Sequence, residues 1–464
     1  MRKMKYIWNI CISAVGFHFL FLLPVSVYAE KMETIHLTPA QAIALALANN
    51  RSLLNSAGTV ESRELSLLSS RSEFDLKIIP STTAGITDNE ETFGAGVSLE
   101  KKFSFGPRAV LSPGIITSSG TYSGKLATAL SIPLLRGWGK SVNEDSVRYS
   151  QFSLRTAERN LYLNRVGVVL DTVSAFYGIV KQQELLRLFD AQVKKLSGHA
   201  QIARIKEKVG LATPIDIYRA EIRMKDVEDQ REVARENLQD VKDRLRFILS
   251  LPLDSSLEIS ADIIPEKVRI TPEQAMETAM KNRIELEQSE DEMQEAQRQS
   301  EIARHNILPQ LDLLVEYDRF SDSEEIERSL NLGEDRWSFR IVSATDLART
   351  SEKTNYRQSL INIRTSKLNQ QTRQEEIRRE IRRQMEFLQK AEERMKIRQE
   401  QIQQAQSKLA LAKIKFDHSM ADNFDVIEAE TELRQARVNL LSVQTDYIVG
   451  TYRMRAVLGT LLER

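Results

Sequence analysis

Two long parts of this chain repeat apolar residues at every seventh position, the pattern of helices packed as coiled coils. In residues 352–418 the stripe consists of Ile381, Leu388, Met395, Ile402, Leu409 and Phe416. The segment that follows carries Val426, Leu433, Leu440, Tyr447 and Met454, and a second stripe rich in small residues runs beside it. Sustained heptads predict coiled-coil packing. About 66 helical residues span on the order of 100 Å at ~1.5 Å per residue, longer than a globular core requires.

Residues 140–208 form an equivalent long span in the first half of the chain. In both halves the apolar seam is narrow and most other positions are polar. That pattern favours helices packed side by side with water on two faces, because a solid bundle needs a broader apolar stripe.

Shorter segments alternate apolar and polar residues, as strands with two different faces do. In residues 93–105 one face is apolar and comprises Phe93, Ala95, Val97, Leu99, Phe103 and Phe105. Residues 122–132, 311–318 and 337–341 alternate in the same way. The pattern suits a barrel wall between lipid and a water-filled lumen. It suits an ordinary half-buried antiparallel sheet equally well.

The chain contains a large internal repeat. LTPAQAIALALANNRSLLNS at residues 37–56 returns as ITPEQAMETAMKNRIELEQS at residues 270–289. We therefore expect two structural repeats, residues 30–262 and 263–464, each running helix, strands, long helical hairpin. Strands are predicted at about 78–133 and about 309–345, and hairpin tips near 209–214 and 418–423. The opening helices start at Thr-Pro pairs and are expected to end near Pro80 and Pro309.

The hairpin tips have the residues that end one helix and begin the next. In the first, Gly210 can adopt the left-handed conformation, Thr213 supplies an N-cap, and Pro214 follows it. In the second, Ser419 stands where glycine is expected, and Asp422 or Asn423 supplies the cap.

Residues 1–29 have the basic start, the apolar run and the small-residue site before Glu30 that are typical of a secretory signal peptide. An uncleaved membrane anchor is the alternative. Removal of this segment leaves no cysteine and 62 basic against 65 acidic residues, which gives no support to nucleic-acid binding. No later stretch is expected to cross a bilayer as a helix, so a membrane-spanning part would consist of strands.

Several motifs resemble the TolC family of outer-membrane efflux proteins. They are the two Thr-Pro-x-Gln-Ala starts, Val-Gly-Leu at 209–211, Asp-Val-Ile-x-Ala at 425–429, Pro-Leu-Leu-Arg-Gly-Trp-Gly at 133–139 and Val-Leu-Gly-Thr-Leu at 457–461. The resemblance covers nearly all of the mature chain and keeps the order of the motifs.

The resemblance implies a mainly α fold with a small antiparallel β part. A duplicated strand-pair and long-helix-hairpin unit would form a trimeric outer-membrane β-barrel, continued by a periplasmic α-helical (coiled-coil) barrel. It implies a homotrimer in the cell outer membrane of a Gram-negative bacterium, in contact with outer-membrane lipid and extending into the periplasm. Its partners would be a periplasmic adaptor protein and an inner-membrane transporter, and its function would be passive efflux of small molecules.

The resemblance also assigns roles to residues at the tips. Val209, Gly210 and Leu211 match the motif that contacts the adaptor, whereas Ser419 and Met420 depart from it. The basic residue that some family members use to hold the entrance closed has no counterpart, because Ala421 occupies that position.

Asp425 and Glu428 fall on the positions where the family narrows its periplasmic entrance with acidic rings. Three copies of each would select cations and raise some of the carboxyl pKa values. Taken from the residues alone, Asp425 is equally a first-turn acid that complements the helix dipole, and Glu428 a solvated residue.

The sequence contains no nucleophile elbow, P-loop or dinucleotide loop, and its five histidines lack ligand spacing. We therefore expect no enzyme activity, no metal and no cofactor. Two other functions remain open: a type I protein secretion conduit, and a non-channel periplasmic coiled-coil scaffold or adaptor.

Overall fold

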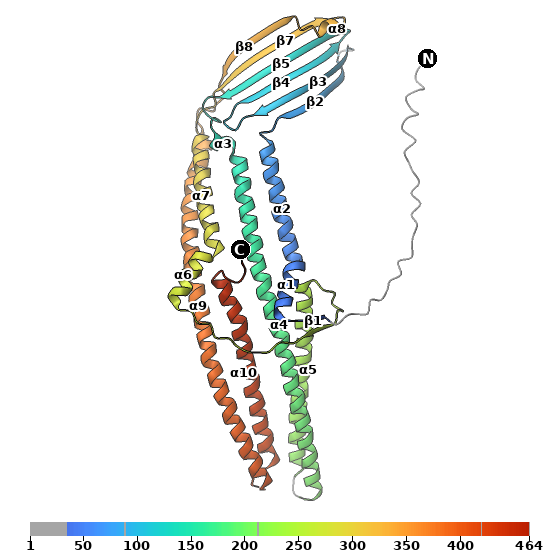
Figure 1. Cartoon of the computed structure of the whole chain (residues 1–464), viewed down its shortest axis with the longest axis vertical. Coiled ribbons are helices and arrows are strands. Elements are labelled where there is room, and N and C mark those ends of the chain that lie inside the picture. The colour runs from blue at the N-terminus through green and yellow to red at the C-terminus, as the bar shows by residue number, and fades with distance from the viewer. Residues whose placement is uncertain (1–34, 88–89, 211–212, 419, 464) are drawn as a thin grey trace, which may run out of the picture.

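The computed structural model describes residues 35–87, 90–210, 213–418 and 420–463. The molecule is elongated (Figure 1). A curved sheet forms one end, and long helices run from it to two hairpin tips at the other end. The expected signal peptide, residues 1–29, lies outside the described residues.

The two halves of the chain contain the same series of helices. In the first half these are α1 (Pro39–Asn49), α2 (Arg51–Ser72), α4 (Asp145–Lys208) and α5 (Pro214–Leu249). In the second half they are α6 (Pro272–Asn282), α7 (Ile284–His305), α9 (Thr350–Asp417) and α10 (Asn423–Val457). Short helices α3 (Lys140–Asn143) and α8 (Ile326–Ser329) lie next to the sheet.

The opening helix of each half begins as predicted, with Thr38 or Thr271 in a capping box. It is not continuous, because α2 starts afresh after Asn50. The Asn50 side chain accepts hydrogen bonds from the backbone of the first turn of α2 and donates one to the carbonyl of Ile248 at 2.8 Å. The second copy breaks at the corresponding Arg283.

The expected end of the first helix near Pro80 is wrong. α2 ends at Ser72, and Pro80 lies within strand β2 (Lys77–Thr87), opposite Val97. β2 is an edge strand, where a residue without an N–H is tolerated.

Six strands form one antiparallel sheet in the order β2-β3-β4-β5-β7-β8. The first half contributes β2, β3 (Glu90–Lys102), β4 (Arg108–Ser118) and β5 (Thr121–Pro133). The second half contributes β7 (Asp312–Ser323) and β8 (Glu334–Val342). The β5–β7 pair joins the two halves, and β2 and β8 are the free edges. A separate parallel pair, β1 (Ile35–Leu37) and β6 (Leu257–Ile259), lies beside the middle of the helices.

The register of the strands confirms the predicted alternation. Leu111, Thr128, Tyr317 and Trp337 are opposite one another on successive strands and therefore share a face. One prediction was wrong: Phe103 and Phe105 lie beyond the end of β3, in a turn where Gly106 has φ +126°.

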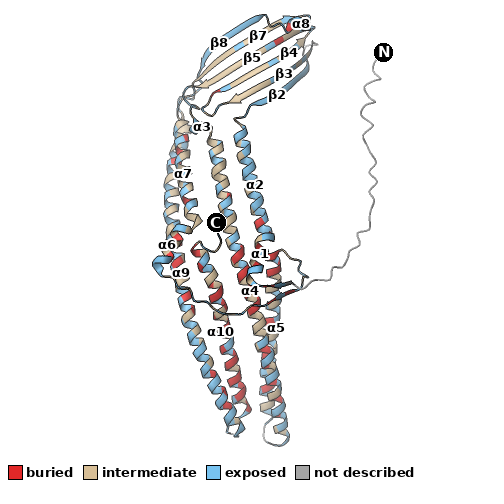
Figure 2. Ribbon diagram, in the orientation of Figure 1, coloured by how far each residue is buried: buried red, intermediate tan, exposed pale blue. Residues whose placement is uncertain are grey.

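The buried residues follow the heptad seams. Figure 2 shows them concentrated in the middle and lower parts of the helices, whereas the sheet is mostly intermediate or exposed. Ile381, Leu388 and Leu409 of α9 pack with Leu433 and Met454 of α10 in two buried clusters, as predicted. The helical layer is therefore held together along narrow lines.

Among the helices of the described residues, one is apolar enough over part of its length to cross a membrane by composition alone. It is α4, contrary to the expectation that no later stretch would qualify. Half of that apolar window is buried. Its residues Val173, Phe176 and Ile179 belong to the central core that α1 and α5 share, so packing accounts for the apolar run.

Gly450 marks a point where the seam leaves no space for a side chain. A Cβ atom there would lie 2.8 Å from the Phe387 ring and 3.0 Å from a Leu388 methyl group. We expect Gly450→Ala to lower the free energy of unfolding by ~1–3 kcal/mol, the usual cost of overpacking. The measurement is thermal or denaturant unfolding of the purified protein.

Gly167→Ala is the matched control, since Gly167 is also in a helix interior but has no atom within 4 Å of the point that a Cβ would occupy. It should be neutral or stabilising by roughly 0.5–1 kcal/mol because of the better helix propensity of alanine. Equal effects of the two substitutions would contradict close packing at Gly450.

Candidate functional site

The second hairpin tip is fixed by a reciprocal cap. Asp422, rather than Asn423, is the N-cap of α10, and its Oδ1 accepts the N–H of Asp425 at 3.0 Å. Asp425 Oδ2 accepts the N–H of Asp422 at 3.3 Å. Asp425 therefore performs the helix-start role that its position alone suggested.

The first tip is capped in the same way. Asp216 Oδ2 accepts the N–H of Thr213 at 2.9 Å. This backbone hydrogen bond, together with the one from the Thr213 hydroxyl, lowers the pKa of Asp216. The duplication has thus preserved the chemistry that starts both returning helices.

Asp425 also belongs to an acidic column on α10. Asp425, Glu428 and Glu432 follow one another at helical spacing on its surface. Lys408 of α9 donates to Glu432 Oε1 at 2.7 Å. That hydrogen bond and the charges of the three carboxylates raise the pKa of Lys408. The structure thus brings the two predicted entrance residues together and adds Glu432 and Lys408 to them.

The same positions of the first hairpin carry the opposite charge. The motifs after the two tips align Asp216 with Asp425, so Arg219 and Arg223 correspond to Glu428 and Glu432. The Arg219 guanidinium lies 5.2 Å from the Phe424 ring centroid, which brings the two tips into contact. The acidic column is therefore particular to the second hairpin.

The residues predicted to contact an adaptor lie at the far ends of the hairpins. Val209 is 65% exposed and Met420 is 76% exposed. Gly210 has φ +75°, the left-handed conformation predicted for it, directly after α4. Leu211 and Ser419 lie outside the described residues.

A buried polar cluster next to the tips was not predicted. Glu430 of α10 is 4% exposed, and its carboxylate lies 3.4 Å from His199 Nε2 and 3.5 Å from Lys195 Nζ, both on α4. Burial opposes ionisation of Glu430, but the adjacent His199 ring and the Lys195 charge outweigh it and lower its pKa. The Asn423 side chain is hydrogen-bonded to His199 Nδ1 at 2.7 Å and donates to the His199 carbonyl at 3.1 Å.

Arg434 extends this cluster by one helical turn. Its guanidinium is buried, donates to Gln230 of α5 at 3.2 Å and lies 5.3 Å from the Phe189 ring centroid of α4. Burial lowers its pKa. The Nε of Arg434 has no hydrogen-bond partner among the described residues. Glu430 and Arg434 together connect the second hairpin to both helices of the first.

The polar face of the sheet is held by pairs across the strands. Ser98 and Ser112 hydroxyls are 3.1 Å apart, Lys125 lies 3.2 Å from Asp318, and Arg340 contacts Glu316 at 2.6 Å. The register places all three pairs on the face opposite Trp337. One face of the sheet is thus arranged for water and the other for an apolar environment.

The described residues contain no group of three or more His, Cys, Asp or Glu side chains placed to hold a metal ion.

Comparison with known proteins agrees with this geometry. Residues 275–460 match the outer membrane efflux protein family. No curated protein sequence matches the chain.

Three solved structures illustrate the similarity of the fold. The CmeC outer membrane channel of Campylobacter jejuni is 16% identical with a TM-score of 0.72, over 92% of this chain and 86% of that one. VceC of Vibrio cholerae is 15% identical with a TM-score of 0.71, over 91% and 96%. The open state of the MtrE outer membrane channel of Neisseria gonorrhoeae is 15% identical with a TM-score of 0.67, over 92% and 90%.

These comparisons confirm the fold class expected from the sequence. The family match covers most of the second half, and the channel fold covers nearly the whole chain. Together they show that the second half of the chain is similar to outer membrane efflux proteins, and that nearly the whole chain has the fold of outer membrane channels.

Proposed function

We propose that three copies of this chain close around one axis into a passive conduit for small-molecule efflux. A periplasmic adaptor would dock on the hairpin tips and link the conduit to an inner-membrane transporter that supplies the energy. The observation that carries this proposal is that both the sheet and the helical layer of a single copy end in unpaired edges.

In the sheet, β2 and β8 each have one side without a partner strand among the described residues. Free edges are a liability unless another strand pairs with them. Trp337 and Phe339 on β8 are 65% and 62% exposed, on the apolar face. Pairing of β8 with β2 of the next copy would close a barrel whose apolar side faces lipid. A scaffold that stays in the periplasm has no use for such a face.

The helical layer has matching apolar edges. In the lower half, α4 packs between α5 and α10, and α10 packs against α9, so α5 and α9 are the outer helices. Each has an exposed apolar stripe. On α5 it comprises Ile215, Tyr218 and Ile222, and on α9 Ile397, Leu411 and Ile414. The coiled-coil packing within each hairpin can therefore continue between copies.

In this assembly the acidic columns of three copies would face one another at the periplasmic end. Asp425 and Glu428 would narrow the entrance and favour cations there. The exposed Val209 and Met420, with Gly210, Leu211 and Ser419, would form the docking surface for the adaptor.

The Glu430 cluster would hold the closed arrangement of the hairpins. An entrance can widen only if α10 moves relative to α4, and the contacts of Glu430 with Lys195 and His199 cross that boundary. We infer that this cluster acts as the link that opening must break.

The first prediction tests assembly. The purified protein should be a trimer with an empty axis in projection images, and Ile222→Asp or Leu411→Asp should weaken it, because each places a charge in the interface between copies. Glu232→Gln, an exposed position on α5, is the control. The readouts are native mass and the temperature at which the trimer dissociates on a gel. Compact monomers would refute the conduit.

A second prediction concerns the entrance. The double variant Asp425→Asn, Glu428→Gln should lower cation selectivity in planar bilayers, measured as a smaller reversal potential in a salt gradient. Asp216→Asn alters the equivalent cap on the first tip and should leave selectivity unchanged. Selectivity equal to wild type in the double variant would remove these residues from the entrance.

A third prediction concerns the buried link. Glu430→Ala leaves a buried polar cluster without its carboxylate and should cost ~1–3 kcal/mol of stability while raising the open probability in bilayers. Glu432→Ala, two residues away, removes an exposed ion pair and should cost less than about 1 kcal/mol. An open probability that is the same in the Glu430→Ala and Glu432→Ala variants would contradict the role of Glu430 as a link.

The pH dependence follows from the lowered pKa of Glu430. The stabilisation is fully present above the ordinary carboxyl value of 4.5 and is lost as the pH falls through the lower folded-state pKa. Wild-type channels should therefore open more often as the pH falls below the ordinary carboxyl value and through the lower folded-state pKa of Glu430. Glu430→Gln should remove this part of the pH response.

A further inference from the structure

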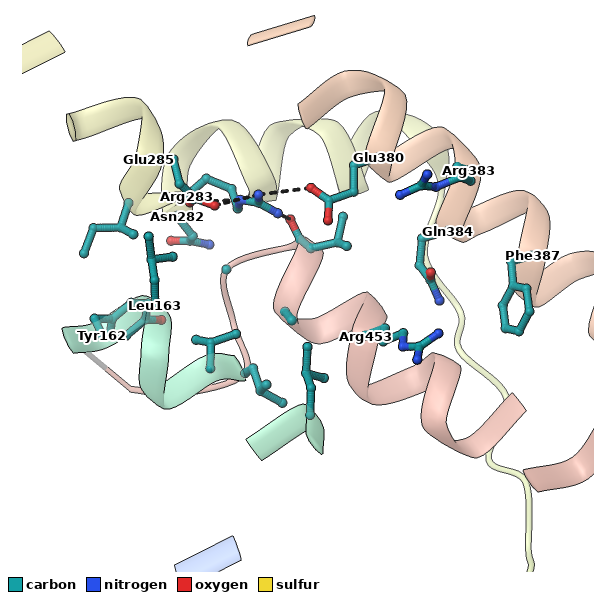
Figure 3. Close-up of a pocket in the computed structure, with 17 residues that line it drawn as sticks. Tyr162, Leu163, Asn282, Arg283, Glu285, Glu380, Arg383, Gln384, Phe387 and Arg453 are labelled. Atoms are coloured by element: carbon teal, nitrogen blue, oxygen red, sulfur yellow. Dashed lines mark hydrogen bonds and ion pairs between the residues drawn. The ribbon is translucent and has the colours of Figure 1, made fainter. Parts of the chain in front are cut away.

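A cavity of about 550 Å³ lies halfway along the helices, away from the tips and the sheet (Figure 3). It forms where the start of α7 and the end of α10 meet between the long helices α4 and α9. A cavity of this size can hold a drug-sized molecule.

Much of the cavity wall is apolar. Leu163, Val166 and Leu170 line it from α4. Phe387 of α9 and Ile284 at the start of α7 complete the apolar part. This lining would accept the hydrocarbon or aromatic body of a ligand.

The two acidic residues of the cavity are already neutralised. Arg283 contacts Glu285 at 2.7 Å and Glu380 at 3.0 Å, and it donates to the carbonyl of Val457 at 3.2 Å. Figure 3 shows this group along one side of the cavity, between Leu163 and Gln384. Arg283 thereby joins α7, α9 and the end of α10, and its charge is not available to a ligand.

Two further arginines line the same cavity without a partner. Arg383 comes from α9 and Arg453 from α10, and neither has an acidic or hydrogen-bonding partner among the described residues. Gln384, which Figure 3 shows between them, already donates to the Gly450 carbonyl at 2.9 Å. Both side chains are exposed to solvent at the cavity, so the cavity carries two solvated positive charges that no described residue of the protomer pairs.

We propose that this cavity binds amphipathic organic anions. The anionic group, a carboxylate, sulfonate or phosphate, lies between Arg383 and Arg453, whose planar guanidinium groups suit paired hydrogen bonds to such oxygens. The apolar body lies against Phe387 and the α4 residues. A bound anion also joins α9 to α10, and because it binds the folded protein it stabilises that state.

The test uses naphthalene-1-sulfonate as the probe, with the full-length protein in lipid nanodiscs. Isothermal titration, corrected with empty nanodiscs, should show saturable binding, and the probe should raise the unfolding temperature. The neutral naphthalene-1-sulfonamide and the cationic 1-naphthylmethylammonium should bind at least tenfold more weakly, since only the sulfonate meets both arginines.

Single Arg383→Gln and Arg453→Gln substitutions should each weaken binding roughly tenfold, and the double substitution more than either. Arg382→Gln is the matched control, because Arg382 is exposed like its neighbour Arg383 but does not line the cavity. Arg383→Lys keeps the charge without the planar fork and should lose less affinity than Arg383→Gln.

The proposal is overturned by absence of saturable binding to the wild type, by equal binding of the sulfonamide, or by unchanged affinity in the double variant. Binding is read independently of conductance. A protein that binds the probe but forms no pore supports this cavity and refutes the conduit, and a selective pore that binds no probe does the reverse.

Discussion

The structure depends on a narrow apolar seam between antiparallel long helices. Large and small residues meet across the seam, so that Leu388 and Phe387 of α9 close over Gly450 of α10 with no space for a Cβ atom. Burial along a line rather than around an axis lets a helical layer one helix thick persist over on the order of 100 Å. The same narrowness leaves apolar stripes on the two outer helices and two free strand edges. A single copy therefore packs well within its helical layer but leaves these stripes and strand edges unpaired. Pairing with further copies, as proposed, would cover them.

Duplication has preserved backbone chemistry and changed charge. Both tips use an acidic residue at the third helical position to hold the cap, Asp216 and Asp425. Beyond the cap the copies diverge, since Arg219 stands where Glu428 stands in the second half. The cap is fixed by backbone geometry that both hairpins need. The outward charge is free to change because it contributes little to stability at an exposed position. In the proposed conduit, the acidic column would distinguish the second hairpin as the one that faces the axis.

The sequence predicted what local chemistry and periodicity determine, and it missed what depends on packing between distant segments. The heptads, the alternating strands and the Thr38 and Thr271 caps are all present, because each rests on residues within a turn or two. The break at Asn50 was missed although its cap on the first turn of α2 is local; the bond that anchors Asn50 to the Ile248 carbonyl, 198 residues away, is not visible in the sequence. Pro80 was predicted to end a helix, but it lies in β2, where the sheet edge tolerates a residue without an N–H. The sequence does not show that β2 is an edge strand, because strand order depends on pairing between distant segments. The Glu430 cluster gave no motif, because its members come from different helices.

The buried polar cluster differs from an apolar contact in the free energy that its separation costs. The seams within each hairpin gain free energy from every apolar group they bury, and separating them would cost all of it. A buried ion pair is different, because the cost of removing its charges from water nearly cancels their attraction. Glu430, with His199 and Lys195 beside it, fixes the position of α10 on α4 when closed, at small net stability. When α10 moves, water restores the solvation of these groups and offsets most of the lost contact. Ile427 of α10 adds a buried apolar contact with α4 and α5 at the same boundary. In the proposed conduit, the polar cluster would therefore make this boundary specific in its geometry, while opening would also have to separate that apolar contact.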